Sequence, residues 1–333
     1  MGTLRYIVKR IAISIVLLFI TSFLVYAGIR STVDPTARLA QNRNPQARID
    51  LKEKLHLDEP LVTQYKRWVG NAIKGDLGVS DTDQEAVTAK LKRSLLITTE
   101  LLLWGVIIAG LLGITLGVIA AIKRNTPIDY GIQTYSSMGI AQPPFLFAFV
   151  LMAFFAILIP RWIGLEDPIF YIIGNPEGHF GQDAQGAWTT SSIIEYARRL
   201  AMPVGTLSIQ LIASWSRYQR ASMIESLQSD FIRTAKAKGA SRPRVYFRHA
   251  LRNAELPMVN VIALDIGALF GGLIVTEKIF NINGMGSLFL RSLSRGDATT
   301  LVSWTILTAA AIIICNLIAD LILPFVDPRI RTQ

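Results

Sequence analysis

The residues whose types and spacing could support chemistry are concentrated in a basic segment at positions 230–257. Ala, Lys and Arg favour helix through Lys238, and Gly239 suits the left-handed residue that ends a helix. Ser241 then offers a capping oxygen, and Pro243 falls in the first turn of a second helix. The sequence therefore predicts two short helices with a break at Gly239.

The first of these helices has two unlike faces. Phe231 and Ala235 are four residues apart and share one side, whereas Arg233 and Lys236 lie elsewhere on the helix. Such an apolar ridge in a basic surround suits docking on another protein. A solvated basic helix that touches lipid headgroups is the alternative interpretation.

Patterns that indicate catalysis are absent from the sequence. Gly is never followed by Lys, so the P-loop pattern Gly-x-x-x-x-Gly-Lys-[Ser/Thr] does not occur, and neither does His-Glu-x-x-His or Gly-x-Ser-x-Gly. One cysteine, Cys315, and three histidines leave no disulfide framework and no Cys/His metal site. We therefore expect no catalytic residue, no metal site and no ATPase site in this chain.

Composition indicates the elements that must position the basic segment. Of the 333 residues, 51% are hydrophobic and 17% are charged, and the mean hydropathy is +0.40. This balance predicts an integral membrane protein, whose spans are helices because every backbone polar group must be satisfied within the bilayer. The net charge of +10 then reflects Lys and Arg on the cytoplasmic side rather than nucleic-acid binding.

Six stretches approach the roughly 20 apolar residues that a helix needs to cross a membrane. They are residues 11–29, 101–122, 138–159, 200–215, 258–275 and 301–326. With both termini placed in the cytoplasm, the short cytoplasmic segments carry 16 Lys and Arg and the short outer segments carry 6, as the positive-inside rule requires. The first stretch could instead be a cleaved signal peptide, but its 19 apolar residues favour a retained span.

Polar side chains interrupt the predicted spans. Asp265 and Gln210 lie in the two least apolar stretches, and we expect them to line a pathway, with an interhelical hydrogen bond as an equal alternative for Asp265. A structural role is favoured for Asp320, near the end of the last span. An ion-coupled carrier that uses Asp265 and Asp320 as relay groups is a competing hypothesis. The role of Glu277, which follows the fifth stretch, is not deducible.

The basic segment has Arg-Thr-Ala-Lys-Ala-Lys-Gly at 233–239 and Leu-Pro at 256–257, and it resembles the EAA loop of ABC transporter permease subunits. It is most similar to the form in the dipeptide/oligopeptide/nickel permease family, where Arg-Thr commonly replaces the Glu-Ala of the general loop. Three further stretches resemble this family, namely Leu-His-Leu-Asp-Glu-Pro-Leu at 55–61, His-Ala-Leu-Arg-Asn-Ala at 249–254 and Asp-Pro-Arg-Ile-Arg at 327–331.

The resemblance implies an all-α integral membrane fold, the six-helix ABC importer type I permease. It divides the chain into an N-terminal tail with the first transmembrane helix (1–30), an extracytoplasmic segment (31–94) and a core permease domain (95–333) with a coupling loop at about 225–257. Contacts to an ATPase subunit are expected from eight residues of this loop. These are Phe231, Arg233, Thr234, Ala235, Lys236, Ala237, Lys238 and Gly239.

The resemblance also implies partners. A second homologous permease subunit, two ATP-binding subunits that hold ATP and Mg, and an extracytoplasmic substrate-binding protein are expected, in a multi-pass cell-membrane assembly with cytoplasmic termini. This chain itself is then not an enzyme and holds no cofactor. Short peptides are the expected substrate, and a nickel chelate or another small solute is the alternative.

Overall fold

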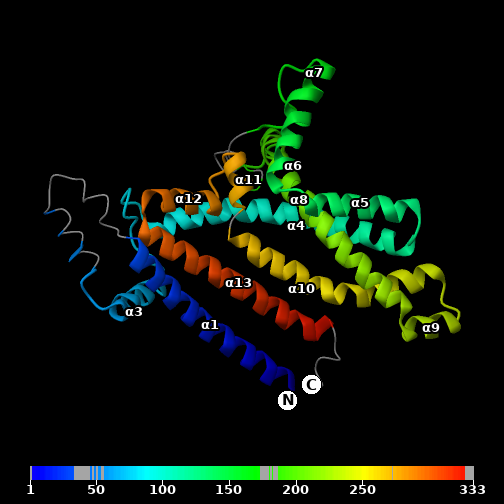
Figure 1. Ribbon diagram of the computed structural model, residues 1–333, viewed down its shortest axis with the longest axis horizontal. Helices are drawn as coiled ribbons and strands as arrows, with labels where there is room; N and C mark the ends of the chain where they lie inside the picture. Colours follow the sequence, from blue (N-terminus) through cyan, green and yellow to red (C-terminus); the bar gives the residue numbers. More distant parts are fainter. Residues whose placement is uncertain are drawn as a thin grey trace.

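The computed structural model describes residues 2–33, 46, 49, 52–53, 56–172, 180, 182, 187–271 and 273–326. Within these residues every regular element is a helix, and β pairing is limited to an isolated bridge between Val79 and Ala86. The helices, in chain order (Figure 1), are α1 (Gly2–Thr32), α3 (Leu61–Ala72), α4 (Val87–Ile122), α5 (Pro127–Ala141), α6 (Pro144–Met152), π-helical η2 (Ala153–Leu158), α7 (Ile159–Ile163), α8 (Thr190–Gln228), α9 (Asp230–Ala237), π-helical η3 (Arg244–Ala250), α10 (Leu251–Phe270), α11 (Ile274–Ile279), α12 (Met285–Arg295) and α13 (Ala298–Val326).

Five helices among the described residues are long and apolar enough to cross a membrane. They are Ile7–Thr32, Val87–Ile122, Pro144–Ile163, Arg244–Phe270 and Ala298–Ile318. Each overlaps a predicted span. The remaining prediction, 200–215, falls inside α8, whose 39 residues are ample to span but include many hydroxyl and charged side chains. The expected all-α membrane architecture is confirmed.

Two of the predicted span boundaries were wrong. Residues 138–141 belong to α5 rather than to the third span, because Gln142 is extended (ψ 140°) ahead of two prolines that prevent the helix from continuing. Residues 274–275 belong to the separate short helix α11, because α10 ends at Phe270.

Small residues on α4 let α8 approach closely. Gly105, Ala109, Gly113 and Gly117 are spaced four apart and are all buried. A Cβ on Gly117 would lie 2.6 Å from the Cβ of Gln219 on α8, which leaves no room for any other residue there. This repeat of small residues is the arrangement that brings membrane helices into van der Waals contact. The α4 and α8 pair therefore forms the rigid centre of the fold.

The two ends of α4 mark the two ends of the molecule. With 36 residues the helix is about 54 Å long. Val87 and Leu91 pack with Trp304 of α13 at one end, whereas Val118 and Ala121 pack with Ile232 of α9 at the other. We call these the Val87 end and the Ile122 end. In Figure 1, α12 lies near the Val87 end and α9 near the Ile122 end.

Candidate functional site

Helix α9 is a separate stub at the Ile122 end. It begins at Asp230 because Ser229 is extended (ψ 155°) and separates α9 from the end of α8. Ile232 is its only fully buried residue and packs into an apolar cluster with Val118 of α4 and Met223 of α8. One apolar side chain therefore anchors the stub to the two helices at the centre of the fold.

The rest of α9 faces outward, as the sequence predicted. Phe231 is 37% exposed, and Ala235 on the same side is half-buried. The remaining predicted coupling residues are all exposed, namely Arg233, Thr234, Lys236, Ala237, Lys238 and Gly239. The stub thus offers an apolar ridge in a basic surround.

The break after α9 also follows the prediction. Gly239 has φ +80°, the left-handed conformation that glycine adopts at little cost. Its N–H donates to Lys236 O (3.0 Å), and the N–H of Ala240 donates to Ala235 O (3.1 Å). The second helix begins with Pro243 in its first turn and continues through η3 into α10, so it is longer than expected. The sequence analysis did not predict that Ile232 is buried, although an apolar residue three positions before Ala235 indicates a second apolar face.

An ion pair joins α5 and α8 near the Ile122 end. Arg220 of α8 donates to both carboxylate oxygens of Asp129 on α5, at 2.6 and 2.8 Å. The carboxylate also accepts from the N–H of Asn125 (2.9 Å) and from Gln133 (3.1 Å). Hydrogen bonding to Arg220 holds the pKa of Asp129 below its usual value. α5 and α8 are therefore held together by a bidentate, charge-assisted contact.

The predicted pathway residues make interhelical contacts. The indole Nε1 of Trp215 on α8 donates to Oδ2 of Asp265 on α10 at 2.7 Å. The amide of Gln210 donates to the carbonyl of Gln142 at 3.2 Å, where α5 ends. Asp265 therefore makes the interhelical bond that was its alternative role, while it stays only half-buried. The side chain of Asp320 lies outside the described residues.

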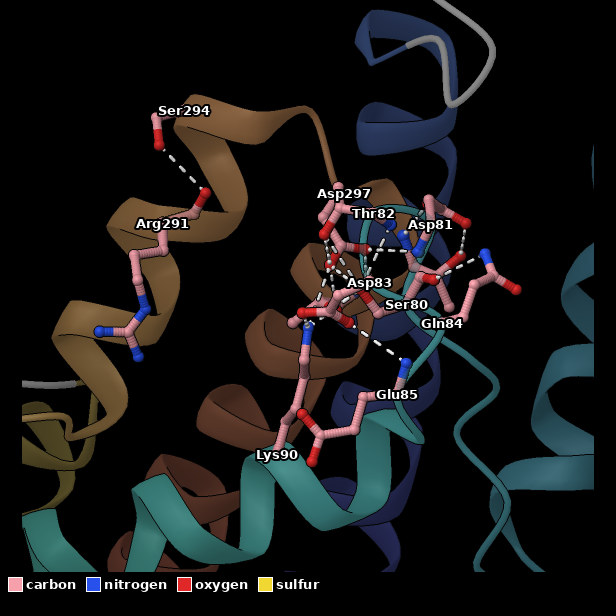
Figure 2. A network of polar contacts seen from close by, with 12 residues as sticks. Ser80, Asp81, Thr82, Asp83, Gln84, Glu85, Lys90, Arg291, Ser294 and Asp297 are labelled. Atoms are coloured by element: carbon pink, nitrogen blue, oxygen red, sulfur yellow. Dashed lines mark hydrogen bonds and ion pairs between the residues drawn. The ribbon is translucent and has the colours of Figure 1, made fainter. Parts of the chain in front are cut away.

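Asp297 organises a polar network at the Val87 end, which Figure 2 shows from close by. Asp297 lies directly before α13 and is 1% exposed. It accepts hydrogen bonds from the hydroxyls of Ser80 (2.6 Å) and Thr300 (2.7 Å) and from the N–H of Asp81 (3.1 Å). The Nζ of Lys90 lies 3.8 Å from it. Residues more than 200 positions apart in sequence thus meet at one buried charge.

The other members of the network also contact one another. Lys90 pairs with Asp83 at 2.6 Å and donates to Ser80 at 3.0 Å. Asp81 accepts two bonds from Thr299, each 2.9 Å, one from the N–H and one from the hydroxyl. The segment before α4 is therefore tied to the start of α13, and we call this set of contacts the Asp297 network.

A charged cavity of about 410 Å³ lies beside the network. Arg291 and Arg295 of α12 line it together with Lys90 and Asp297. Arg291 donates to Asn283 at 2.8 Å. Burial and the nearby charge of Arg295 lower the pKa of Arg291. Cationic groups therefore line this cavity at the Val87 end.

Glu277 is fully buried between three helices. Its Oε1 accepts from Thr98 of α4 at 2.8 Å, and its Oε2 accepts from the N–H of Ser287 of α12 at 2.8 Å. A Cβ on Gly284 would lie 2.3 Å from this carboxylate, so glycine is required there. Glu277 thereby joins α11, α12 and α4, a role that the sequence did not disclose.

Helices long and apolar enough to cross a membrane, a close-packed centre and a basic stub at one end define the class as a helical integral membrane protein. Comparison with protein families then places the chain. The family described as "Binding-protein-dependent transport system inner membrane component" matches residues 113–332, and a second model, "Binding-prot-dependent transport system membrane comp, N-term", matches residues 3–101. The chain belongs to this family of transporter membrane subunits.

Curated relatives resemble the chain along its whole length. The "Di/tripeptide transport system permease protein DppB" of Pseudomonas aeruginosa is 34% identical, with 99% of each chain covered. The "Oligopeptide transport system permease protein OppB" of Mycobacterium bovis is 33% identical, with 99% of each covered. The "Oligopeptide transport system permease protein AppB" of Bacillus subtilis is 32% identical over 98% of this chain and 99% of its own.

Proposed function

We propose that this chain is the permease subunit of an ATP-driven importer of short peptides, and that α9 is the helix through which an ATP-binding subunit moves it. The observation that carries the proposal is the exposure of α9. Seven of its eight residues are not fully buried, whereas Ile232 fastens it to the centre of the fold. A helix held on one side and free on the other suits a contact with another chain.

The packing supports a route for movement from α9 to the rest of the molecule. The cluster around Ile232 contains residues of both α4 and α8. The Asp129–Arg220 pair fixes α5 to α8 at the same end. Because packed helices move as units, a push on α9 would tilt α4, α5 and α8 together. Differential binding of nucleotide and of the loaded binding protein then selects between inward-open and outward-open states.

The charges on α9 support the choice of partner. Arg233, Lys236 and Lys238 are exposed, and Arg233 lies 3.5 Å from the exposed carboxylate of Asp230. These cations would pair with acidic groups on an ATP-binding subunit, while Phe231 fills an apolar hollow. ATP and Mg are then bound by the partner subunits, because the sequence has no P-loop.

Orientation and assembly follow from the same assignment. The Ile122 end and both termini face the cytoplasm, and the Asp297 network and the 410 Å³ cavity face outward towards an extracytoplasmic binding protein. A second homologous permease subunit completes the pathway, with Asp265 and Gln210 among the groups that line it. The names of the curated relatives support short peptides as the substrate.

A charged substitution on α9 tests the proposal. We expect Ala235→Glu to lower peptide uptake by more than about tenfold in proteoliposomes that contain the assembled transporter, since it disrupts the centre of the contact. ATP hydrolysis should continue without transport. Val62→Glu is the matched control, because Val62 is also accessible but lies on α3 at the Val87 end. Unimpaired uptake by Ala235→Glu would count decisively against α9 as the coupling helix.

A further inference from the structure

A second cavity at the Val87 end contains buried hydrogen-bond donors without an acceptor. Its volume is about 230 Å³, and Arg30, Gln64 and Trp68 are among the residues that line it. The Nε and Nη1 atoms of Arg30 and the Nε1 of Trp68 are buried, and no residue in the described part of the chain accepts a hydrogen bond from them. Because an unpaired buried donor is costly, these atoms indicate an acceptor from another molecule.

The same cavity also offers an unused acceptor on Gln64. Gln64 Nε2 donates to the carbonyls of Leu57 (3.3 Å) and Glu59 (2.8 Å), and this pairing fixes the orientation of the amide. Its Oε1 is buried and receives no hydrogen bond from any residue that the structure describes. The carboxylates of Asp76 and Asp81 line the cavity as well, although Asp76 Oδ1 already accepts from the N–H of Gly78 (2.9 Å) and both oxygens of Asp81 accept from Thr299. The lining therefore suits a ligand that carries both an anion and a cation.

The remaining charged groups around the cavity already have partners. Arg67 pairs with Glu59 at 2.9 Å, and His56 lies 3.2 Å from the same carboxylate. Asp81 accepts its two hydrogen bonds from Thr299. Among the described residues, the Arg30 guanidinium lies 5.7 Å over the Tyr26 ring and interacts electrostatically with Asp81, but its Nε and Nη1 donate no hydrogen bond. Arginine at the end of a membrane helix ordinarily reaches to water, so its buried atoms are notable.

An apolar groove lies next to this cavity, against helices α1 and α13. The groove has a volume of about 320 Å³ and is lined by Leu18 and Phe19 of α1 and by Leu307 and Ala310 of α13, among others. Trp68 and Leu77 line both the polar cavity and the groove. α1 and α13 both contain candidate membrane spans. The polar cavity at the end of α1 therefore lies beside an apolar groove formed by helices that contain candidate membrane spans.

We propose that the cavity and the groove together bind one zwitterionic phospholipid with a primary ammonium group, of the phosphatidylethanolamine class. The phosphate accepts hydrogen bonds from Arg30 and Trp68, the ammonium donates to Gln64 and faces Asp76, and one acyl chain lies in the groove. An anionic headgroup without an ammonium leaves the buried amide oxygen of Gln64 unmatched. The lipid bridges α1, α3 and α13 at the Val87 end.

The test measures lipid retention by the assembled transporter. The transporter is extracted from nanodiscs of equal phosphatidylethanolamine and phosphatidylglycerol, and native mass spectrometry counts the lipids that stay on this chain. We expect the wild type to retain one phosphatidylethanolamine in preference to phosphatidylglycerol. Arg30→Gln should reduce this retention by more than about tenfold, because it removes a charge-assisted contact.

Two further variants distinguish a bound lipid from a bound free anion. Ala310→Phe fills the groove without touching the polar cavity and should also reduce retention, whereas Arg93→Gln, at an exposed arginine paired with Glu85 elsewhere on the same face, should not. Equal retention of the two lipids would overturn the proposal, as would full retention by Arg30→Gln. Displacement of the lipid by inorganic phosphate alone, with Ala310→Phe unaffected, would assign the site to a free anion instead.

Discussion

Helix α9 and the Asp297 network lie at opposite ends of α4, and their polar groups are used in opposite ways. The Asp297 carboxylate is buried and accepts hydrogen bonds from four residues of the same chain, Ser80, Asp81, Thr82 and Thr300. The cations of α9 are exposed, and Arg233 contacts a carboxylate that is itself almost fully exposed. The network therefore completes the fold of this chain, whereas α9 offers its groups to a different chain.

This contrast separates stability from coupling. Substitutions in the Asp297 network should lower stability and disturb transport only as a consequence. Substitutions on the exposed side of α9 should disturb transport while stability is unchanged. Ile232 and the Asp129–Arg220 pair form the boundary between the two behaviours, because Ile232 fastens α9 to α4 and α8 and the ion pair fastens α5 to α8.

The largest expected effect is at Asp297. Asp297→Ala removes the acceptor for Ser80 and Thr300 and leaves Lys90 with one carboxylate fewer nearby. Loss of one partner from a buried charged network costs about 3–5 kcal/mol. Thermal unfolding of the purified protein, followed by tryptophan fluorescence, should show a marked drop in Tm. Asp83→Asn, at a more exposed carboxylate, is the control and should cost much less. An unchanged Tm for Asp297→Ala would show that the network does not hold the fold.

The next effect is at Ile232. Ile232→Ala leaves a cavity between α9, α4 and α8, at a cost of about 2–4 kcal/mol. It should also reduce uptake per ATP hydrolysed, because α9 loses its attachment. Phe231→Ala is the matched comparison and should reduce uptake with little change in Tm, since Phe231 is exposed. Equal losses of stability in the two variants would contradict the two-sided description of α9.

A smaller and pH-dependent effect is expected at Asp129. Asp129→Asn weakens the contact with Arg220 and should cost about 1–3 kcal/mol at neutral pH. Because the pKa of Asp129 is lowered in the folded state, its contribution is complete above the unfolded value of about 4 and is lost as the pH falls through the folded value. The difference in Tm between wild type and variant should therefore shrink below about pH 4. If the difference in Tm stayed constant across this pH range, the ionised carboxylate of Asp129 would not be its cause.

The smallest effect on stability is expected at Arg233. Its contact with Asp230 is exposed on both sides, so Arg233→Gln should change the free energy of unfolding by less than about 0.5 kcal/mol. Uptake should fall nonetheless, and it should fall less at high salt, where charge pairing with a partner is screened in the wild type too. A clearly lower Tm for Arg233→Gln would contradict the claim that the exposed side of α9 does not contribute to stability.

The sequence predicted α9 well because the signals for it are local. Its length, the break at Gly239 and its two faces depend on residues within one short segment. Five of the six predicted spans overlap helices that are long and apolar enough to cross a membrane, since apolar length is a local property. The third and fifth spans differ from their predicted limits, because the apolar pattern runs across the two prolines at 143–144 that divide α5 from α6 and across the end of α10 at Phe270.

The Asp297 network could not be predicted in this way. Ser80 and Asp297 are separated by 217 positions, and nothing in either local stretch indicates the other. Glu277 likewise meets Thr98 across 179 positions. Such contacts depend on how α4, α12 and α13 pack together, which local patterns do not specify. The fold class and the stub were thus readable from the sequence, whereas the buried polar groups were not.

The most direct test is to locate α9 in the assembled transporter by crosslinking. The single cysteine is first removed by Cys315→Ser, and Ala235→Cys then places a thiol on the exposed side of α9. A thiol-to-amine crosslinker should join this chain to an ATP-binding subunit, whereas the same treatment of Val62→Cys at the Val87 end should not. Labelling of Ala235→Cys by a membrane-impermeant reagent from outside intact cells, or no crosslink to any other polypeptide, would contradict the account.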